Sequence, residues 1–182
     1  GAVIQNFSVT EVNVKDGPNG PMIVGVTGYL GPKKDGNTMS FKAPLTIGAA
    51  GYNCPVSKKI TQSVFNEPFR DDEHFCGGYR EYWTGVGGCD GGTGPIEIHF
   101  IDEVNPGYFW IFPVSENVVN VGVGMVISEQ RKQKGMRSSL KKMQKWITSE
   151  SPRFSHRFKN AQMVEGTGKG WQLPFGSPRM KP

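Results

Sequence analysis

The stretch PGYFWIFP, residues 106–113, places four aromatic rings in five positions between two prolines. Successive side chains of a β-strand point to opposite faces, so we expect Tyr108, Trp110 and Phe112 to share one face of a strand. Three aligned rings form a broad apolar wall that carries polar atoms at Tyr108 and Trp110. Such a wall is either ordinary core or the lining of a slot for a long apolar ligand, and composition alone favours core.

Alternating runs on both sides of this stretch predict further strands, separated by turns rich in Gly, Pro and Asp. The strand-like runs are residues 7–14, 22–30, 38–50, 78–86, 95–101, 108–114 and 118–127, with another near 171–176. In the run 95–101 the alternation puts Ile96, Ile98 and Phe100 on one face and Glu97 and His99 on the other. Residues 51–75 are expected to form a short helix and loops.

Two helices are expected after the strands. Met136, Leu140, Met143 and Ile147 follow a helical period. Ser151 and Pro152 indicate the start of a second helix, which reaches Ala161. The predicted fold class is therefore α+β, with an antiparallel sheet of about five to seven strands covered by the helices on one face.

The aromatic stretch, followed four positions later by VVNVGVGM, resembles a segment of the geranylgeranyl reductase family of FAD-dependent oxidoreductases, which are flavoproteins similar to p-hydroxybenzoate hydroxylase. Residues 79–88 and 95–108 are similar to the family's approach to that motif. Residues 43–60, APLTIGAAGYNCPVSKKI, resemble its segment beside the flavin. The resemblance is ordered along the chain and covers most of it.

This resemblance implies that the chain is a fragment of a longer flavoprotein. The family's strand, GxGxxG turn and helix, which hold the FAD pyrophosphate, have no counterpart in this sequence. We therefore expect residues 1–60 to be a partial FAD-domain segment, a β-meander followed by a GAAG strand, and residues 61–182 to be the substrate-binding domain. Gly48 and Gly51 are weak cofactor-binding candidates, because Ala50 replaces the family's acidic residue.

The resemblance also implies a function, which is the reduction of isoprenoid or lipid C=C bonds by an FAD-dependent parent enzyme. This chain would contribute the apolar pocket, and would be inactive and free of FAD when isolated. The residues expected to contact a prenyl or lipid substrate are Tyr82, Tyr108, Trp110, Phe112 and Pro113.

Several assignments stay open at this stage. The catalytic residues are unassigned, with Tyr82, Tyr108 or a bound water as proton donor. Arg80 either pairs with a phosphate bidentately or lies on the sheet surface beside Glu81 or Glu97. Two alternative functions remain, a fragment of an FAD monooxygenase acting on an apolar or aromatic compound and a non-catalytic lipid-binding β-domain.

Composition limits the partners. The formal net charge is +5, and the basic residues concentrate in 131–145 and 152–159. A solvated helix face explains them most simply, attraction to anionic lipid headgroups is the next interpretation, and no motif suggests nucleic acid. The cysteine and histidine spacings predict no metal site. The odd number of cysteines, with no CxxC spacing, favours a reducing environment, so we expect a cytoplasmic protein, with peripheral contact to an anionic membrane as a further expectation. No apolar run approaches the ~20 residues of a membrane span.

Overall fold

The computed structural model describes residues 1–32, 37–69, 72–89 and 94–174. The chain divides into two compact units, Gly1–Phe69 and Arg70–Pro182. This division falls later than the boundary expected after residue 60. The reason is local, because a π-helical turn at Ile60–Val64 directly continues the preceding helix of the first unit.

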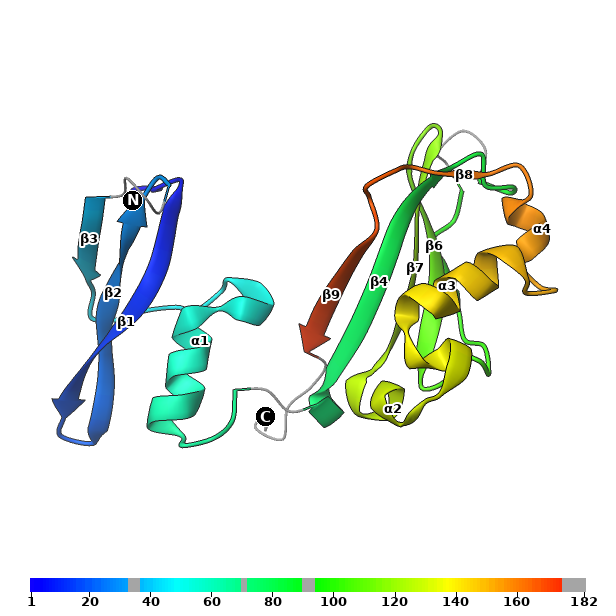
Figure 1. The fold of residues 1–182 in the computed structure, drawn as a ribbon. Helices are drawn as coiled ribbons and strands as arrows, with labels where there is room; N and C mark the ends of the chain where they lie inside the picture. The colour runs from blue at the N-terminus through cyan, green and yellow to red at the C-terminus, as the bar shows by residue number, and fades with distance from the viewer. Residues whose placement is uncertain (33–36, 70–71, 90–93, 175–182) are drawn as a thin grey trace. The chain divides into compact units, whose positions relative to one another are not determined.

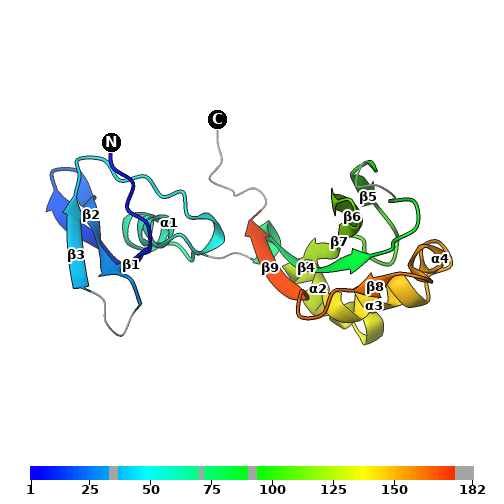
Figure 2. The same ribbon diagram turned by 90° about the horizontal axis from the view of Figure 1, so that it is seen from above.

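The first unit is a three-stranded antiparallel meander with one short helix (Figure 1). Its strands are β1 (Phe7–Gly17), β2 (Gly20–Leu30) and β3 (Asn37–Lys42), and its helix is α1 (Pro55–Lys59). Helix α1 lies beside β1 (Figure 2), where Val12, Cys54 and Val56 form a small buried core.

The expected meander is confirmed, but the GAAG segment is not a strand. Residues 43–50 have no regular structure, although a third strand was predicted over 38–50. Pro44 follows the last ladder residues of β3, and a proline has no N–H to donate to a neighbouring strand. The strand therefore ends at Lys42.

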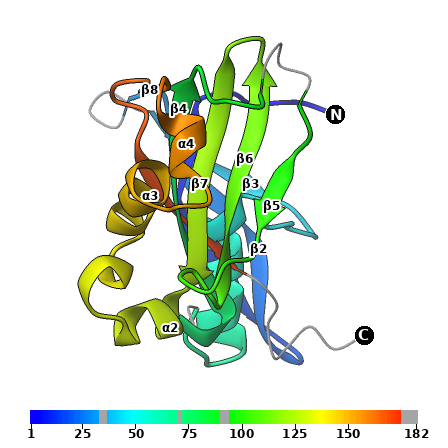
Figure 3. The same ribbon diagram turned by 90° about the vertical axis from the view of Figure 1, so that its right-hand side faces the viewer.

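The second unit is built on an antiparallel sheet, to which the described residues contribute six strands. These are β4 (Phe75–Thr84), β5 (Glu97–His99), β6 (Gly107–Ser115), β7 (Val118–Val126), β8 (Gln162–Met163) and β9 (Lys169–Pro174). Their order is β5-β6-β7-β4-β8, and β9 also pairs with β4. Figure 3 shows β5, β6 and β7 side by side. The α+β fold class with an antiparallel sheet is confirmed.

Helices cover one face of this sheet (Figure 1). They are α2 (Ile127–Lys132), α3 (Leu140–Ser149) and α4 (Ser155–Phe158). Met143 and Ile147 of α3 are fully buried against Val121 and Val123 of β7. None of the helices in the described ranges is long and apolar enough to cross a membrane.

The helices differ from the sequence prediction in four places, one of which is that the second helix ends at Phe158 and not at Ala161. Gly135–Ser138, which includes Met136, forms a 3-10 turn ahead of α3. The second helix begins later than Pro152, because the carbonyl of Ser151 accepts the N–H groups of Phe154 and Ser155 in a preceding turn. Helix α2 was not predicted at all, since the strand pattern was continued to residue 127.

An ion pair attaches the edge strand β5 to α4. Arg157 donates from Nη1 and Nη2 to the two carboxylate oxygens of Glu97, at 2.6 and 2.7 Å. His99 lies 2.9 Å from the same carboxylate, and its ring contacts Phe154. The hydrogen bonds from Arg157 hold the pKa of the Glu97 carboxyl below its usual value, although burial opposes the shift. The polar face of β5 is thus turned toward the helices.

This ion pair predicts a pH-dependent part of the stability. A carboxyl whose folded pKa lies below its unfolded value of about 4.5 stabilises the fold above that value, and the stabilisation is lost as the pH falls toward the folded pKa. Urea titrations should show that Arg157→Met loses about 2–3 kcal/mol at pH 7. Wild type should then lose more stability than the variant between pH 5 and 3, roughly the span over which such a group titrates. Lys142→Gln, on the exposed side of α3, is the control and should change little. Equal acid sensitivity of wild type and Arg157→Met would contradict the assignment.

Candidate functional site

The sheet of the second unit has a face directed away from α3, which we call the open face. On β7, Val119, Val121, Val123 and Met125 are buried on the helix side, so the alternate residues lie on the open face. Strand registers then assign the neighbouring positions. The open face consists of Cys76, Gly78, Arg80 and Tyr82 on β4, Tyr108, Trp110 and Phe112 on β6, Asn120, Gly122, Gly124 and Val126 on β7, and Lys169, Trp171 and Leu173 on β9.

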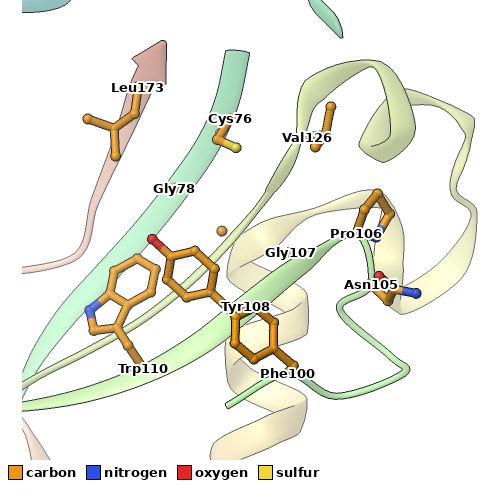
Figure 4. Close-up of a pocket in the computed structure, with 12 residues that line it drawn as sticks. Cys76, Gly78, Phe100, Asn105, Pro106, Gly107, Tyr108, Trp110, Val126 and Leu173 are labelled. Carbon is orange, nitrogen blue, oxygen red and sulfur yellow. The ribbon is translucent and has the colours of Figure 1, made fainter. Parts of the chain in front are cut away.

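One end of the open face is hollowed into a cavity of about 330 Å³. Figure 4 shows the rings of Tyr108, Trp110 and Phe100 along one side and Leu173 on another. Cys76 and Val126 line it from β4 and β7, and Gly78 and Gly124 leave its floor without side chains. The walls are therefore mainly apolar, as a site for a hydrocarbon chain requires.

Trp110 is held flat across β7 by two features of the neighbouring strand. A Cβ at Gly122, its register partner, would overlap the indole ring. The indole Nε1 also donates to the side-chain oxygen of Asn120 at 2.9 Å. Tyr108 and Phe112 flank the ring with centroid distances of 5.7 and 6.0 Å. The aromatic stretch of β6 and the GVG stretch of β7, residues 122–124, thus pack directly against each other.

Gly78 of β4 leaves a position without a side chain next to the Trp110 ring, which we call the neck. Trp171 of β9 is its direct cross-strand partner and is 62% exposed. A Cβ built on Gly78 would lie 3.8 Å from the Trp110 ring and 3.7 Å from the Trp171 carbonyl oxygen, which are ordinary contact distances. The glycine is therefore not required by the backbone or by packing, and it keeps the neck beside the Trp110 ring open.

The structure separates the five expected substrate-contact residues. Tyr108 and Trp110 line the cavity. Phe112 continues the row of rings on the open face, outside the residues that line the cavity. Tyr82 also lies beyond the cavity, with the guanidinium carbon of Arg80 4.5 Å from its ring centroid. Pro113 pairs with Val119 and so lies on the opposite side of the strand from the rings. Contact of any of the five with a substrate stays a prediction.

Gly48 and Gly51 lie in the first unit and have different local roles. A Cβ at Gly48 would lie 2.9 Å from the sulfur of Cys54 and 2.9 Å from the hydroxyl oxygen of Ser57, so the small core needs a glycine there. Gly51 adopts a φ of +68°, which favours glycine, with open space where a Cβ would be. Both have a structural reason to be glycine, and their contact with a cofactor stays a prediction.

Sequence reasoning missed much of the cavity lining, including Cys76, Gly78, Phe100, Val126 and Leu173. The sequence did carry a signal for two glycines of the lining. Gly78 and Gly124 interrupt otherwise strong strand patterns, and an isolated glycine in a strand often marks the close approach of a ligand or another group.

A buried carboxyl lies on the other side of the sheet. Glu81 accepts hydrogen bonds from Tyr79, Trp83 and Gln144 at 3.0 to 3.1 Å. Burial and this carboxylate raise the pKa of Tyr79 to about 12. The group links β4 to α3 and faces away from the cavity. Arg80 therefore does not lie beside Glu81 or Glu97, which both face the helices. Within the described residues, no group of three or more His, Cys, Asp or Glu could hold a metal ion.

The fold of this chain occurs in flavin-dependent enzymes. It superposes on a geranylgeranyl bacteriochlorophyll reductase-like protein from Thermoplasma acidophilum with a TM-score of 0.66 at 16% identity, covering 92% of this chain and 36% of that one. For the flavin-dependent brominase Bmp2 the TM-score is 0.61 at 16% identity, with 91% and 38% covered. For the myxobacterial chondrochloren halogenase CndH it is 0.56 at 15%, with 92% and 35% covered. The chain thus spans little more than a third of these structures.

The sequence itself identifies the family to which the chain belongs. The profile of the geranylgeranyl reductase catalytic domain matches residues 78–168, which is half of the chain. The chain therefore belongs to the geranylgeranyl reductase family, and the resemblance drawn from the aromatic stretch is confirmed. The matched span begins at Gly78 and contains Tyr108, Trp110 and both glycines of the GVG stretch.

Proposed function

We propose that this chain supplies the apolar substrate pocket of a flavin-dependent reductase that saturates C=C bonds of isoprenoid or lipid compounds. The observation that carries the proposal is the aromatic cavity on the open face of a geranylgeranyl reductase catalytic domain. An isolated C=C bond has no polar group for an enzyme to hold, so orientation must come from the shape of an apolar site.

The described residues suggest how the pocket would work. Trp110, fixed by Asn120 and Gly122, gives a rigid wall against which a hydrocarbon chain is aligned. Tyr108 and Phe100, whose centroids are 6.0 Å apart, help to exclude water from one side. Bound FAD, once reduced, would supply the hydride. Among the candidate proton donors, Tyr108 lines the cavity and Tyr82 does not, so the Tyr108 hydroxyl is favoured.

The glycines of the first unit do not by themselves show an FAD site. The space beside Gly48 is occupied by the side chains of Cys54 and Ser57, and Gly51 lies in an exposed turn. Neither makes a row of backbone N–H groups at the start of a long helix, which a pyrophosphate requires.

The isolated chain is expected to be colourless. We expect the 182-residue chain to purify without the visible absorbance of oxidised flavin, and added FAD to bind only weakly. An absorbance spectrum and equilibrium dialysis against FAD measure this directly. A stoichiometric yellow preparation would show that the chain holds the cofactor unaided.

The proposed reaction is tested with the FAD-loaded full-length enzyme, chemically reduced flavin and a prenyl alcohol or phosphate. Mass spectrometry should show the gain of two hydrogens for each bond reduced. The alternatives give different results. Incorporation of an oxygen atom in the presence of O₂ would favour a monooxygenase, and tight binding with no change in mass would favour a lipid-binding module.

We also propose peripheral contact with anionic membranes through α3. Lys141, Lys142 and Lys145 are exposed on this helix, whereas Arg131 and Lys132 of α2 are paired with Asp72 and Glu129. Each lysine near an anionic surface contributes about 1 kcal/mol.

Co-sedimentation with phosphatidylserine vesicles tests this contact. Replacing the three α3 lysines with Gln should weaken binding about 100-fold at low salt. Replacing Lys15, Lys42 and Lys58 of the first unit with Gln removes the same charge and should have a smaller effect. Equal effects of the two triple variants would show that the net charge of the protein, and not the position of the α3 lysines, causes the binding.

A further inference from the structure

Polarity on the open face is sorted along the strands. Cys76, Val126 and Leu173 form an apolar end, where the cavity lies. Four to six residues farther along β4, β7 and β9, polar side chains occupy open-face positions. This polar end consists of Arg80, Tyr82, Asn120 and Lys169. Gly78 lies between the two ends, beside the Trp110 ring and opposite Trp171 in the strand register.

The polar end holds two cations side by side. Arg80 of β4 and Lys169 of β9 are direct cross-strand partners, so their side chains leave the same face of the sheet. Like charges in this arrangement destabilise a sheet. The open-face positions defined above include no Asp or Glu that could offset the repulsion, because the nearest acidic residue of the strand, Glu81, faces α3.

The Arg80 side chain is held in place rather than free in solvent. Its Nη1 donates to the carbonyl of Thr167 at 2.8 Å, and its guanidinium stacks over the ring of Tyr82. Arginine has five N–H donors in a fixed planar arrangement. The donors that Thr167 does not use are therefore oriented for a further acceptor, and phosphate oxygens match that geometry.

We propose that the polar end is an anion subsite, which binds the phosphate-like head group of an amphipathic ligand whose hydrocarbon tail lies in the cavity. The proposal rests on the proposed function for the cavity and adds the head-group chemistry. Gly78 and Arg80 are two residues apart on β4, so the subsite begins about 7 Å along the strand from the neck. An anion there would turn the repulsion between Arg80 and Lys169 into two attractions.

Two kinds of compound carry this chemistry, a prenyl phosphate and a glycerophospholipid with an anionic head. Binding to the 182-residue chain can be followed without FAD, because Cys76 lines the cavity while Cys54 and Cys89 are buried. A bound tail should slow alkylation of Cys76 by a maleimide. Since burial raises the pKa of the Cys76 thiol, the labelling is run at mildly alkaline pH.

The experiment compares geranylgeranyl phosphate, geranylgeraniol, phosphatidic acid in detergent and inorganic phosphate as protecting ligands. The prenyl phosphate should protect Cys76 at concentrations about 10- to 100-fold lower than the alcohol. Arg80→Gln with Lys169→Gln should remove that difference and leave protection by geranylgeraniol unchanged. Lys141→Gln with Lys145→Gln, which removes the same charge from α3, should preserve it. Protection by phosphatidic acid that is lost in the first variant would assign the subsite to a lipid head group, and inorganic phosphate alone should not protect.

The outcomes separate this inference from the proposed function. Equal protection by phosphate and alcohol in the wild type, or a difference that survives in Arg80→Gln/Lys169→Gln, overturns the anion subsite even if the enzyme reduces prenyl chains. A head-group preference that depends on Arg80 and Lys169 supports the subsite even if the enzyme leaves the C=C bonds intact. Circular dichroism of the double variant confirms that the sheet is retained, and Arg80→Lys keeps the charge should the double variant fail to fold.

Discussion

Gly78→Leu is expected to weaken ligand binding in the cavity strongly while leaving the domain folded. The glycine does not adopt a left-handed backbone conformation, and a Cβ there meets its neighbours at ordinary distances. A strand also accepts a branched apolar residue more readily than glycine. The added leucine side chain would project beside the Trp110 ring and fill the neck.

We expect Gly78→Leu to lower the affinity for a prenyl ligand, and kcat/KM of the FAD-loaded enzyme, by about 100-fold or more, which corresponds to about 3 kcal/mol. The free energy of unfolding should change by less than about 1 kcal/mol. Cys76 protection and urea titration measure the two quantities on the same protein.

The neighbouring Gly77 provides the matched control. Its Cβ would point toward the helices and lie 3.2 Å from a methyl carbon of Leu140. Gly77 lines the cavity through its backbone alone, so Gly77→Ala should affect packing against α3 and change ligand binding little. If Gly78→Leu binds ligand as wild type does, the neck beside Trp110 is not the path of the hydrocarbon chain.

The local alternation of the sequence predicted much of the site. It assigned Tyr108, Trp110 and Phe112 to one face, and their ring contacts confirm that arrangement. Alternation cannot tell which face is buried. In and just after β5 the apolar residues proved to be the exposed ones, with Ile98 49% and Phe100 77% exposed, while Glu97 faces the helices. The ion pair to Arg157, sixty residues away, decided the outcome.

The remainder depended on contacts between distant strands. The cavity floor exists because Gly78 lies opposite Gly124, and Trp110 lies flat because it is opposite Gly122. Such registers follow from the pairing of β4, β6 and β7, which no local pattern specifies. For the same reason Leu173 could not be placed beside Cys76 until β9 was seen to pair with β4.

Trp110→Ala is expected to impair turnover far more than stability. The indole is partly exposed on the open face, and one hydrogen bond to Asn120 fixes its orientation. Its removal should therefore cost about 1–2 kcal/mol in unfolding free energy, less than the ~3–5 kcal/mol typical of a buried Trp→Ala change. Loss of the wall should lower kcat/KM for a prenyl substrate by about 100-fold, because the chain is no longer aligned.

Phe109→Ala is the matched control on the same strand. Phe109 is fully buried against Phe154 on the helix side, so its truncation should cost the full ~3–5 kcal/mol. Its effect on the turnover of molecules that remain folded should be small, since it does not line the cavity. Asn120→Ala keeps the indole and removes its anchor, and should give an intermediate loss of turnover with little loss of stability. If Trp110→Ala instead unfolds as readily as Phe109→Ala, the ring belongs to the core and the wall of the substrate pocket lies elsewhere.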